Sequence, residues 1–137
     1  RPLKMVFNAD GIELNNNDET TIKIQADTIE LKNRTSSTVT ITADSIELKE
    51  SAIAVKLTAS SIELDCMPAK IALSTASGIE LSNAPASAKF SASGIELGAA
   101  SASVKVSPAT IELSNAAANI KLSPLSVSIN NGALEVI

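Results

Sequence analysis

Carboxylate and ammonium side chains recur at regular places in this sequence and are its first candidates for chemistry. Paired carboxylates catalyse acid–base reactions when their environments push their pKa values apart. Here every glutamate of the series sits in the same surroundings, between two apolar residues, so the pattern indicates a structural role. The glutamates are Glu13, Glu30, Glu47, Glu63, Glu80, Glu96 and Glu112, and the lysines of the alternate units are Lys23, Lys56, Lys89, Lys105 and Lys121.

Other catalytic and ligand-binding patterns are missing from the sequence. There is no histidine to act as the base of a nucleophilic triad, although serine and threonine are abundant. A cluster of histidine and cysteine that could hold a metal is absent, and Cys66 is the single cysteine. We therefore expect no catalytic, cofactor-binding or metal-binding residue, no cofactor and no enzyme activity in this chain.

Composition narrows the class of protein further. The chain has 137 residues, of which 45% are apolar, so it can bury a core. Its net charge is −4 and only 1% of its residues are aromatic, which argues against nucleic-acid binding. No apolar run approaches the roughly 18 residues of a membrane span. Charge is uneven, because residues 1–65 hold 18 of the 26 charged residues and the later linkers carry almost none.

An internal repeat dominates the sequence. The tripeptide Ile-Glu-Leu recurs every 16 or 17 residues, and a second apolar–polar–apolar unit lies between each pair of copies. Together these make seventeen units, from Met5/Phe7 to Leu134/Val136, and Ala88 is the one small residue among their flanking positions. Alternation with period two predicts a short strand with one buried face in each unit. Short linkers such as NADG, TADS and SPAT predict sharp corners.

The repeat of short strands and corners indicates an assembly of several chains. If each short linker turns the chain by about 120°, three chains can wind together and direct their apolar pairs at a common axis. A lone chain would then leave both its backbone ladder and its apolar side chains without partners. We expect an all-β, intertwined triple-stranded β-helix, a homotrimeric β-prism needle on the order of 80 Å long. The Glu and Lys side chains would point outward, pair across neighbouring strands and oppose slips of register.

A monomeric β-solenoid that binds a surface, as an adhesive module does, is the alternative. Regular threonine ladders on an outward face would favour it, whereas the outward series here is Glu and Lys. The mass of the protein in solution separates the two predictions.

The repeat series, quoted most clearly by residues 70–137, closely resembles the C-terminal needle of VgrG proteins. The resemblance covers essentially the whole chain, and the ending VSINNGALEVI is its most specific part. These are tail-spike components of the bacterial type VI secretion system and are similar to the central spike of contractile phage tails. The resemblance implies that 1–137 is a single repetitive needle domain, a C-terminal fragment of a longer spike protein. It also implies assembly in the cytoplasm, secretion into a target cell through its membrane, and carriage of effectors.

The resemblance further implies that a PAAR-repeat tip protein sits on the C-terminal end. The last strand would leave apolar side chains and strand-edge groups uncovered there. We predict a docking platform made of Asn130, Asn131, Gly132, Ala133, Leu134, Glu135, Val136 and Ile137.

Overall fold

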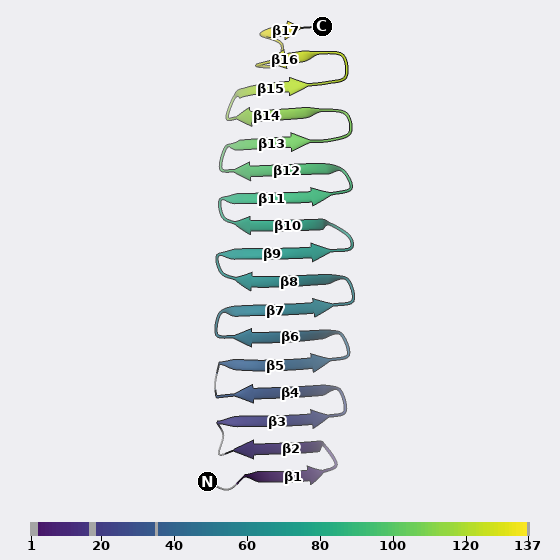
Figure 1. Cartoon of the computed structure of the whole chain (residues 1–137), viewed down its shortest axis with the longest axis vertical. Helices are drawn as coiled ribbons and strands as arrows, with labels where there is room; N and C mark the ends of the chain where they lie inside the picture. Colours follow the sequence, from purple (N-terminus) through teal and green to yellow (C-terminus); the bar gives the residue numbers. More distant parts are fainter. Residues whose placement is uncertain (1–2, 17–18, 35, 137) are drawn as a thin grey trace. The chain divides into compact units, whose positions relative to one another are not determined.

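The chain is all-β in the computed structural model, which describes residues 3–16, 19–34 and 36–136. No helix occurs in those ranges. The chain divides into two compact units, Arg1–Met67 and Pro68–Ile137. Each unit is an antiparallel meander in which every strand is followed by its neighbour (Figure 1). The all-β class predicted from the repeat is confirmed, and the long antiparallel meander is consistent with the predicted β-helical prism.

The first unit contains eight of the described strands, and each of them begins and ends within two residues of a predicted apolar–polar–apolar unit. They are β1 (Lys4–Asn8), β2 (Gly11–Asn16), β3 (Thr20–Gln25), β4 (Thr28–Asn33), β5 (Ser37–Thr42), β6 (Ser45–Glu50), β7 (Ile53–Thr58) and β8 (Ser61–Cys66).

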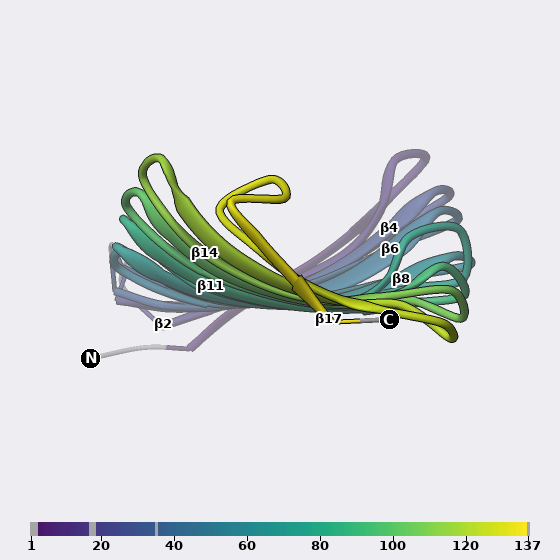
Figure 2. The ribbon, with the colours of Figure 1, turned by 90° about the horizontal axis from the view of Figure 1, so that it is seen from above.

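The second unit contains nine described strands, which shorten toward the C-terminus. They are β9 (Ala69–Ser74), β10 (Gly78–Asn83), β11 (Ala86–Ser91), β12 (Gly94–Ala99), β13 (Ala102–Val106), β14 (Ile111–Asn115), β15 (Ala118–Leu122), β16 (Val127–Ile129) and β17 (Leu134–Val136). Seen from above in Figure 2, the strands are bent rather than straight.

The register places the apolar pairs in rows. In the second unit Leu97 lies opposite Val104, Val104 opposite Leu113, and Leu113 opposite Ile120. The small Ala88 lies between Leu81 and Leu97, so large residues flank it on both neighbouring strands. Since side chains alternate along a strand, these rows share one side of each sheet, here called the apolar face. The middle Glu and Lys residues share the opposite side, the charged face.

Consecutive strands pair with each other inside one chain. Both kinds of linker reverse the chain, so β2 pairs with β1 and β3, and β14 pairs with β13 and β15. The prediction that a lone chain leaves its backbone ladder unpaired is therefore wrong. A linker of a few residues closes a hairpin at a small entropic cost, and it presents the next strand before any second chain can.

Side-chain oxygens hold the short corners. At the last residue of the preceding strand, or at the residue just after it, a hydroxyl or amide oxygen accepts the backbone N–H two or three residues on. Ser123 does so from Ser126 at 3.1 Å, and Thr58 from Ser61 at 3.0 Å. Asn8 accepts from Asp10 at 3.0 Å in the first corner. Such local bonds satisfy turn amides that have no ladder partner.

No side chain of the described residues is buried, although the chain is rich in large aliphatics. Ile120 is 42% exposed and Leu113 is 45% exposed, in the middle of the second unit. The accessible surface is 9688 Å². A compact monomer of this mass would expose about 6,700 Å². The apolar face is therefore a surface that lacks its partner, as the sequence predicted.

Candidate functional site: the uncovered apolar face and the C-terminal turn

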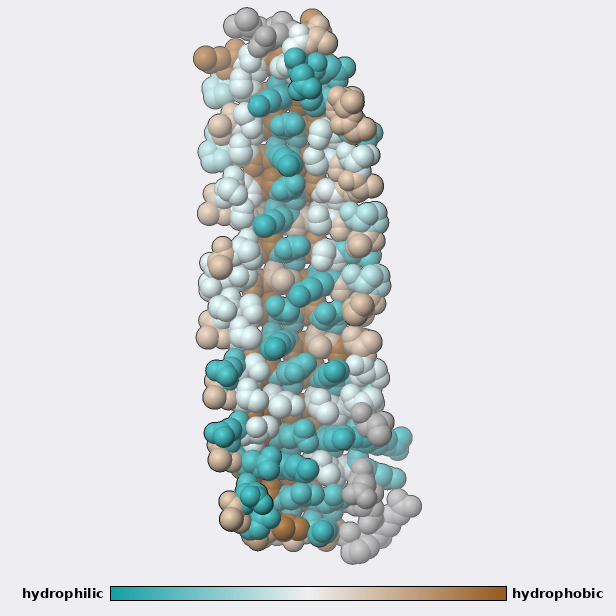
Figure 3. Space-filling model, turned by 180° about the vertical axis from the view of Figure 1, so that it is seen from behind, coloured by the Kyte–Doolittle hydropathy of each residue, from teal (hydrophilic) through white to brown (hydrophobic). Residues whose placement is uncertain are grey.

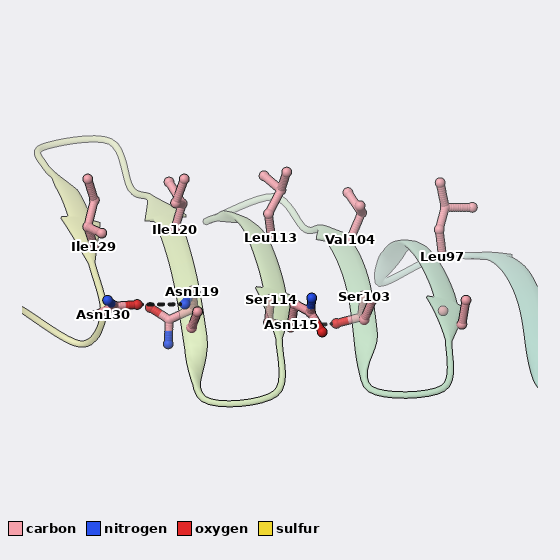
Figure 4. Close-up of a pocket in the computed structure, with 14 residues that line it drawn as sticks. Leu97, Ser103, Val104, Leu113, Ser114, Asn115, Asn119, Ile120, Ile129 and Asn130 are labelled. Carbon is pink, nitrogen blue, oxygen red and sulfur yellow. Dashed lines mark hydrogen bonds between the residues drawn. The ribbon is translucent and has the colours of Figure 1, made fainter.

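A groove of about 650 Å³ runs over the apolar face of the second unit. Figure 4 shows Leu97, Val104, Leu113, Ile120 and Ile129 standing in one row on its floor and pointing to the same side. Alanines border this row at the strand ends, among them Ala99, Ala102 and Ala118. Large residues in the middle and small ones beside them leave room for a closely approaching second surface.

The equivalent groove of the first unit, of about 620 Å³, has a polar border. Its apolar row is formed by Ile22, Leu31, Val39, Leu48 and Val55. The positions that correspond to the alanines of the second unit hold Thr20, Asn33, Ser37 and Glu50. The Thr20 hydroxyl donates to Asn33 Oδ1 at 3.2 Å. The two units therefore present the same apolar row with different borders.

Glu50 is a carboxylate on the apolar face of the first unit, at the border of the groove. It accepts hydrogen bonds from the hydroxyls of Ser37 and Ser36, the latter at 3.1 Å. The bond from Ser37 is the main cause that lowers the pKa of Glu50 below its ordinary value of 4.5, followed by the bond from Ser36. The side chain is therefore held in its charged form.

The charged face carries the Glu and Lys residues opposite one another. Glu96 lies opposite Lys105, and Lys105 opposite Glu112. Lys105 Nζ is 3.3 Å from Glu96 Oε1, and Lys23 Nζ is 4.0 Å from Glu13 Oε2. These side chains are more than a third exposed, so each pair contributes little to stability. Figure 3 shows this face, with hydrophilic side chains in a column over the strands of each unit.

The predicted docking platform lies in the last hairpin. Asn130, Asn131, Gly132 and Ala133 form the turn between β16 and β17, and Leu134 begins β17 with 57% of its surface exposed. Glu135 and Val136 lie in β17, opposite Ser128 and Val127. Ile137 lies outside the described residues. The structure thus gathers most of these residues at one hairpin, and their role in docking stays a prediction.

Asn119 lies in β15 and bonds to this turn, and it is not among the residues that the sequence predicted for the platform. Its backbone N–H donates to Asn130 Oδ1 at 3.1 Å, and its Nδ2 donates to Asn131 Oδ1 at 2.9 Å (Figure 4 shows Asn119 beside Asn130). The departure of residues 130–132 from the repeat was a visible signal. Which earlier residue would meet them was not, because that contact depends on strand register.

Residues 3–16, 19–34 and 36–136 contain no group of three or more histidine, cysteine, aspartate or glutamate side chains placed to hold a metal ion. Within the same ranges, no helix has the length and apolar character needed to cross a membrane.

Residues 70–135, just under half of the chain, match the profile of a family described as phage baseplate V C-terminal trimerisation domain. No curated protein matched the chain. No solved structure matched it either. The family match covers most of the second unit, including its apolar row and the last hairpin. The match indicates a structural, spike-like character for this part of the chain, and trimerisation is the property that the family's description names.

Proposed function

We propose that this chain is a rigid, non-enzymatic needle whose three copies cover one another's apolar faces, and that it forms the envelope-puncturing spike of a type VI secretion system. The observation that supports this proposal most directly is that no side chain of the described residues is buried. A chain with that much apolar surface and no core of its own gains its stability from assembly.

The excess of exposed surface fits the interface of an obligate oligomer. The difference between 9688 Å² and the surface of a compact monomer is about 3,000 Å² per chain. Obligate interfaces bury about 2,000–5,000 Å² and are strongly apolar. Further copies of this chain are the occupant that we infer. Two copies could cover each other face to face, whereas the match to a trimerisation domain favours three.

The finer assignment rests on the resemblance of the chain to VgrG needles, which is most specific at its ending. Under this assignment, the spike assembles in the cytoplasm, is driven transiently through the membrane of a target cell, and carries effectors with it. A PAAR-repeat protein covers the C-terminal end. The exposed Leu134 side chain supports a cover at this place.

The molar mass in solution tests the assembly. Light scattering on a size-exclusion column should give a mass near three times 14.1 kDa. A mass twice that of the chain would replace the trimer by a face-to-face dimer. A monomer that stays folded would contradict the proposal of a core shared between chains. The monomeric β-solenoid that binds a surface would then be the favoured function.

A further inference from the structure

The apolar rows by themselves do not fix the register in which copies of the chain meet. Large aliphatic side chains follow one another in both units, from Ile22 to Val55 in the first and from Leu97 to Ile129 in the second. If one copy shifted along another by a full repeat, which is two strands, each row would still lie against a row of the same kind. A single register therefore needs a feature of the apolar face that does not repeat.

Strand β11 carries such a feature, because it holds Ala88 and Phe90 on the apolar face. Both residues lie between large aliphatic residues of the two neighbouring strands, namely Leu81 and Leu97 for Ala88, and Ile79 and Ile95 for Phe90. A methyl group between two leucine side chains leaves a dent in the face. A phenyl ring between two isoleucine side chains reaches further from the sheet than they do, and makes a rise.

Phe90 is not placed to fill the dent of its own strand. Side chains two residues apart on a strand are about 6.7 Å apart at their backbone and stand side by side, roughly perpendicular to the sheet. Ala88 is only partly buried, and 40% of Phe90 is exposed. Each copy therefore presents one rise and one dent next to each other, at the level of β11.

We propose that Phe90 of each copy packs over Ala88 of a neighbouring copy, and that this contact fixes the register of the assembly. The inference rests on the proposed core shared between chains, for which the excess surface of about 3,000 Å² per chain is the argument that further copies are the occupant. Copies that meet in register bring β11 level with β11. In a closed ring each copy then supplies one ring and receives one.

A shifted register loses this fit. Displacement by one repeat brings β13 to the level of β11, so Phe90 meets Val104 in place of Ala88. The face is then overpacked at Phe90, and the dent over Ala88 stays empty. The contact thus favours one alignment among several that the aliphatic rows accept equally.

A nuclear Overhauser effect between differently labelled copies tests the contact in the unsubstituted protein. One sample carries labelled alanine and valine methyl groups, the other carries protonated phenylalanine rings in a deuterated background, and the two are refolded together. The chain has two phenylalanines and no tyrosine or tryptophan, so the ring signals are simple to assign. We expect an effect from the Phe90 ring to the Ala88 methyl group of another copy. The methyl group of Ala72, which lies opposite Glu80 on the charged face, is the control and should show none.

Two outcomes of this experiment would overturn the inference. An assembly in which the Phe90 ring reaches Val104 of another copy would have a shifted register. An assembly with no effect between the Phe90 ring and Ala88 of different copies would lack the contact.

Substitutions provide a second measurement. Ala88→Leu fills the dent and should lower the melting temperature of the assembly by about 5 °C, because the ring of the neighbouring copy loses its place. Phe90→Val in the same chain should recover about half of that loss, since residues in contact are not additive. Ala72→Leu adds the same side chain on the charged face and is the matched control. An Ala88→Leu protein that melts with this control would contradict the contact.

Failure of the proposed function gives a different result. A protein that light scattering finds to be a monomer would contradict the shared core and the contact of Phe90 with Ala88 together. A protein that assembles without this contact would keep the shared core and overturn the inference alone.

Discussion

At the scale of single residues, the corners decide whether consecutive strands can close a ladder. Gly94 begins β12 with a φ of 138°, and a Cβ built on it would lie 1.9 Å from the carbonyl oxygen of Val106. At Gly98, four residues on in the same strand, an added Cβ would make only an ordinary van der Waals contact, 3.5 Å from Ser87 Oγ. A side chain therefore fits at Gly98 but not at Gly94, although both glycines lie in β12.

Gly94→Ala should destabilise the folded protein by about 1–3 kcal/mol, because the new methyl group forces the corner to shift and the backbone conformation disfavours it. Gly98→Ala is the control and should change stability by less than about 1 kcal/mol. Thermal unfolding of both variants checks this. Equal melting temperatures would show that the corner adapts without cost.

Glu50 predicts a pH dependence. Its pKa is lowered in the folded state by the hydroxyls of Ser37 and Ser36, so its contribution to stability is present above pH 4.5 and is lost as the pH falls through the lowered pKa. Ser37→Ala removes the main cause and should raise the pKa of Glu50. A carbon-detected NMR titration of the Glu50 carboxyl measures it, with Ser82→Ala as the control. An unchanged titration in Ser37→Ala would contradict the assignment.

At the scale of the element, each strand has two faces with opposite demands. In β14, Leu113 stands on the floor of the groove, while its neighbour Ser114 points to the other side and shares a 2.7 Å hydrogen bond with Ser103. The ladder of β14 is made by backbone hydrogen bonds and requires neither side chain. The two faces of the strand are therefore expected to differ in their effect on assembly and not in their effect on the formation of the strand.

Leu113→Asp should abolish the trimer, because it places an unpaired charge in a surface that assembly would bury. The expected loss is at least about 3 kcal/mol per copy. Ser114→Asp adds the same side chain one residue away on the charged face and should leave the mass unchanged. Light scattering compares the two variants. A trimer of the Leu113→Asp protein would contradict the proposed interface.

At the scale of the whole molecule, the chain has strands without a core. Described side chains are all at least partly exposed, so ladder hydrogen bonds and corner contacts are what one copy supplies alone. Such a chain gains its apolar burial only when copies meet. Folding and assembly should then be one linked process.

The melting temperature should therefore rise with protein concentration, as mass action requires for an oligomer that unfolds to single chains. Thermal scans over a hundredfold range of concentration test this, with the strand signal followed by circular dichroism. A melting temperature that stays constant over that range would mean that one copy is stable by itself. It would contradict the linkage.

Much of this architecture could be predicted from the repeat. The alternation of apolar and polar residues placed the strands and assigned Leu113 and Glu112 to opposite faces, because side chains alternate at every residue of a strand. The contact of Asn119 with Asn130 could not be predicted, since it joins residues on different strands and depends on their register. The hydrogen bond from Ser36 to Glu50 depends in the same way on strand pairing, because Ser36 lies between β4 and β5 and Glu50 lies in β6.

The sequence by itself determined the period, the two faces, the place of the corners and the need for further copies. It did so because these properties depend on residues that are close along the chain. Only the tertiary structure decided that consecutive strands pair within one chain, that the borders of the two grooves differ, and that Asn119 closes the last turn. Those features depend on which strands become neighbours. The apolar pattern does not predict whether a strand pairs with the next strand of its own chain, through hairpin closure, or with a strand of another chain.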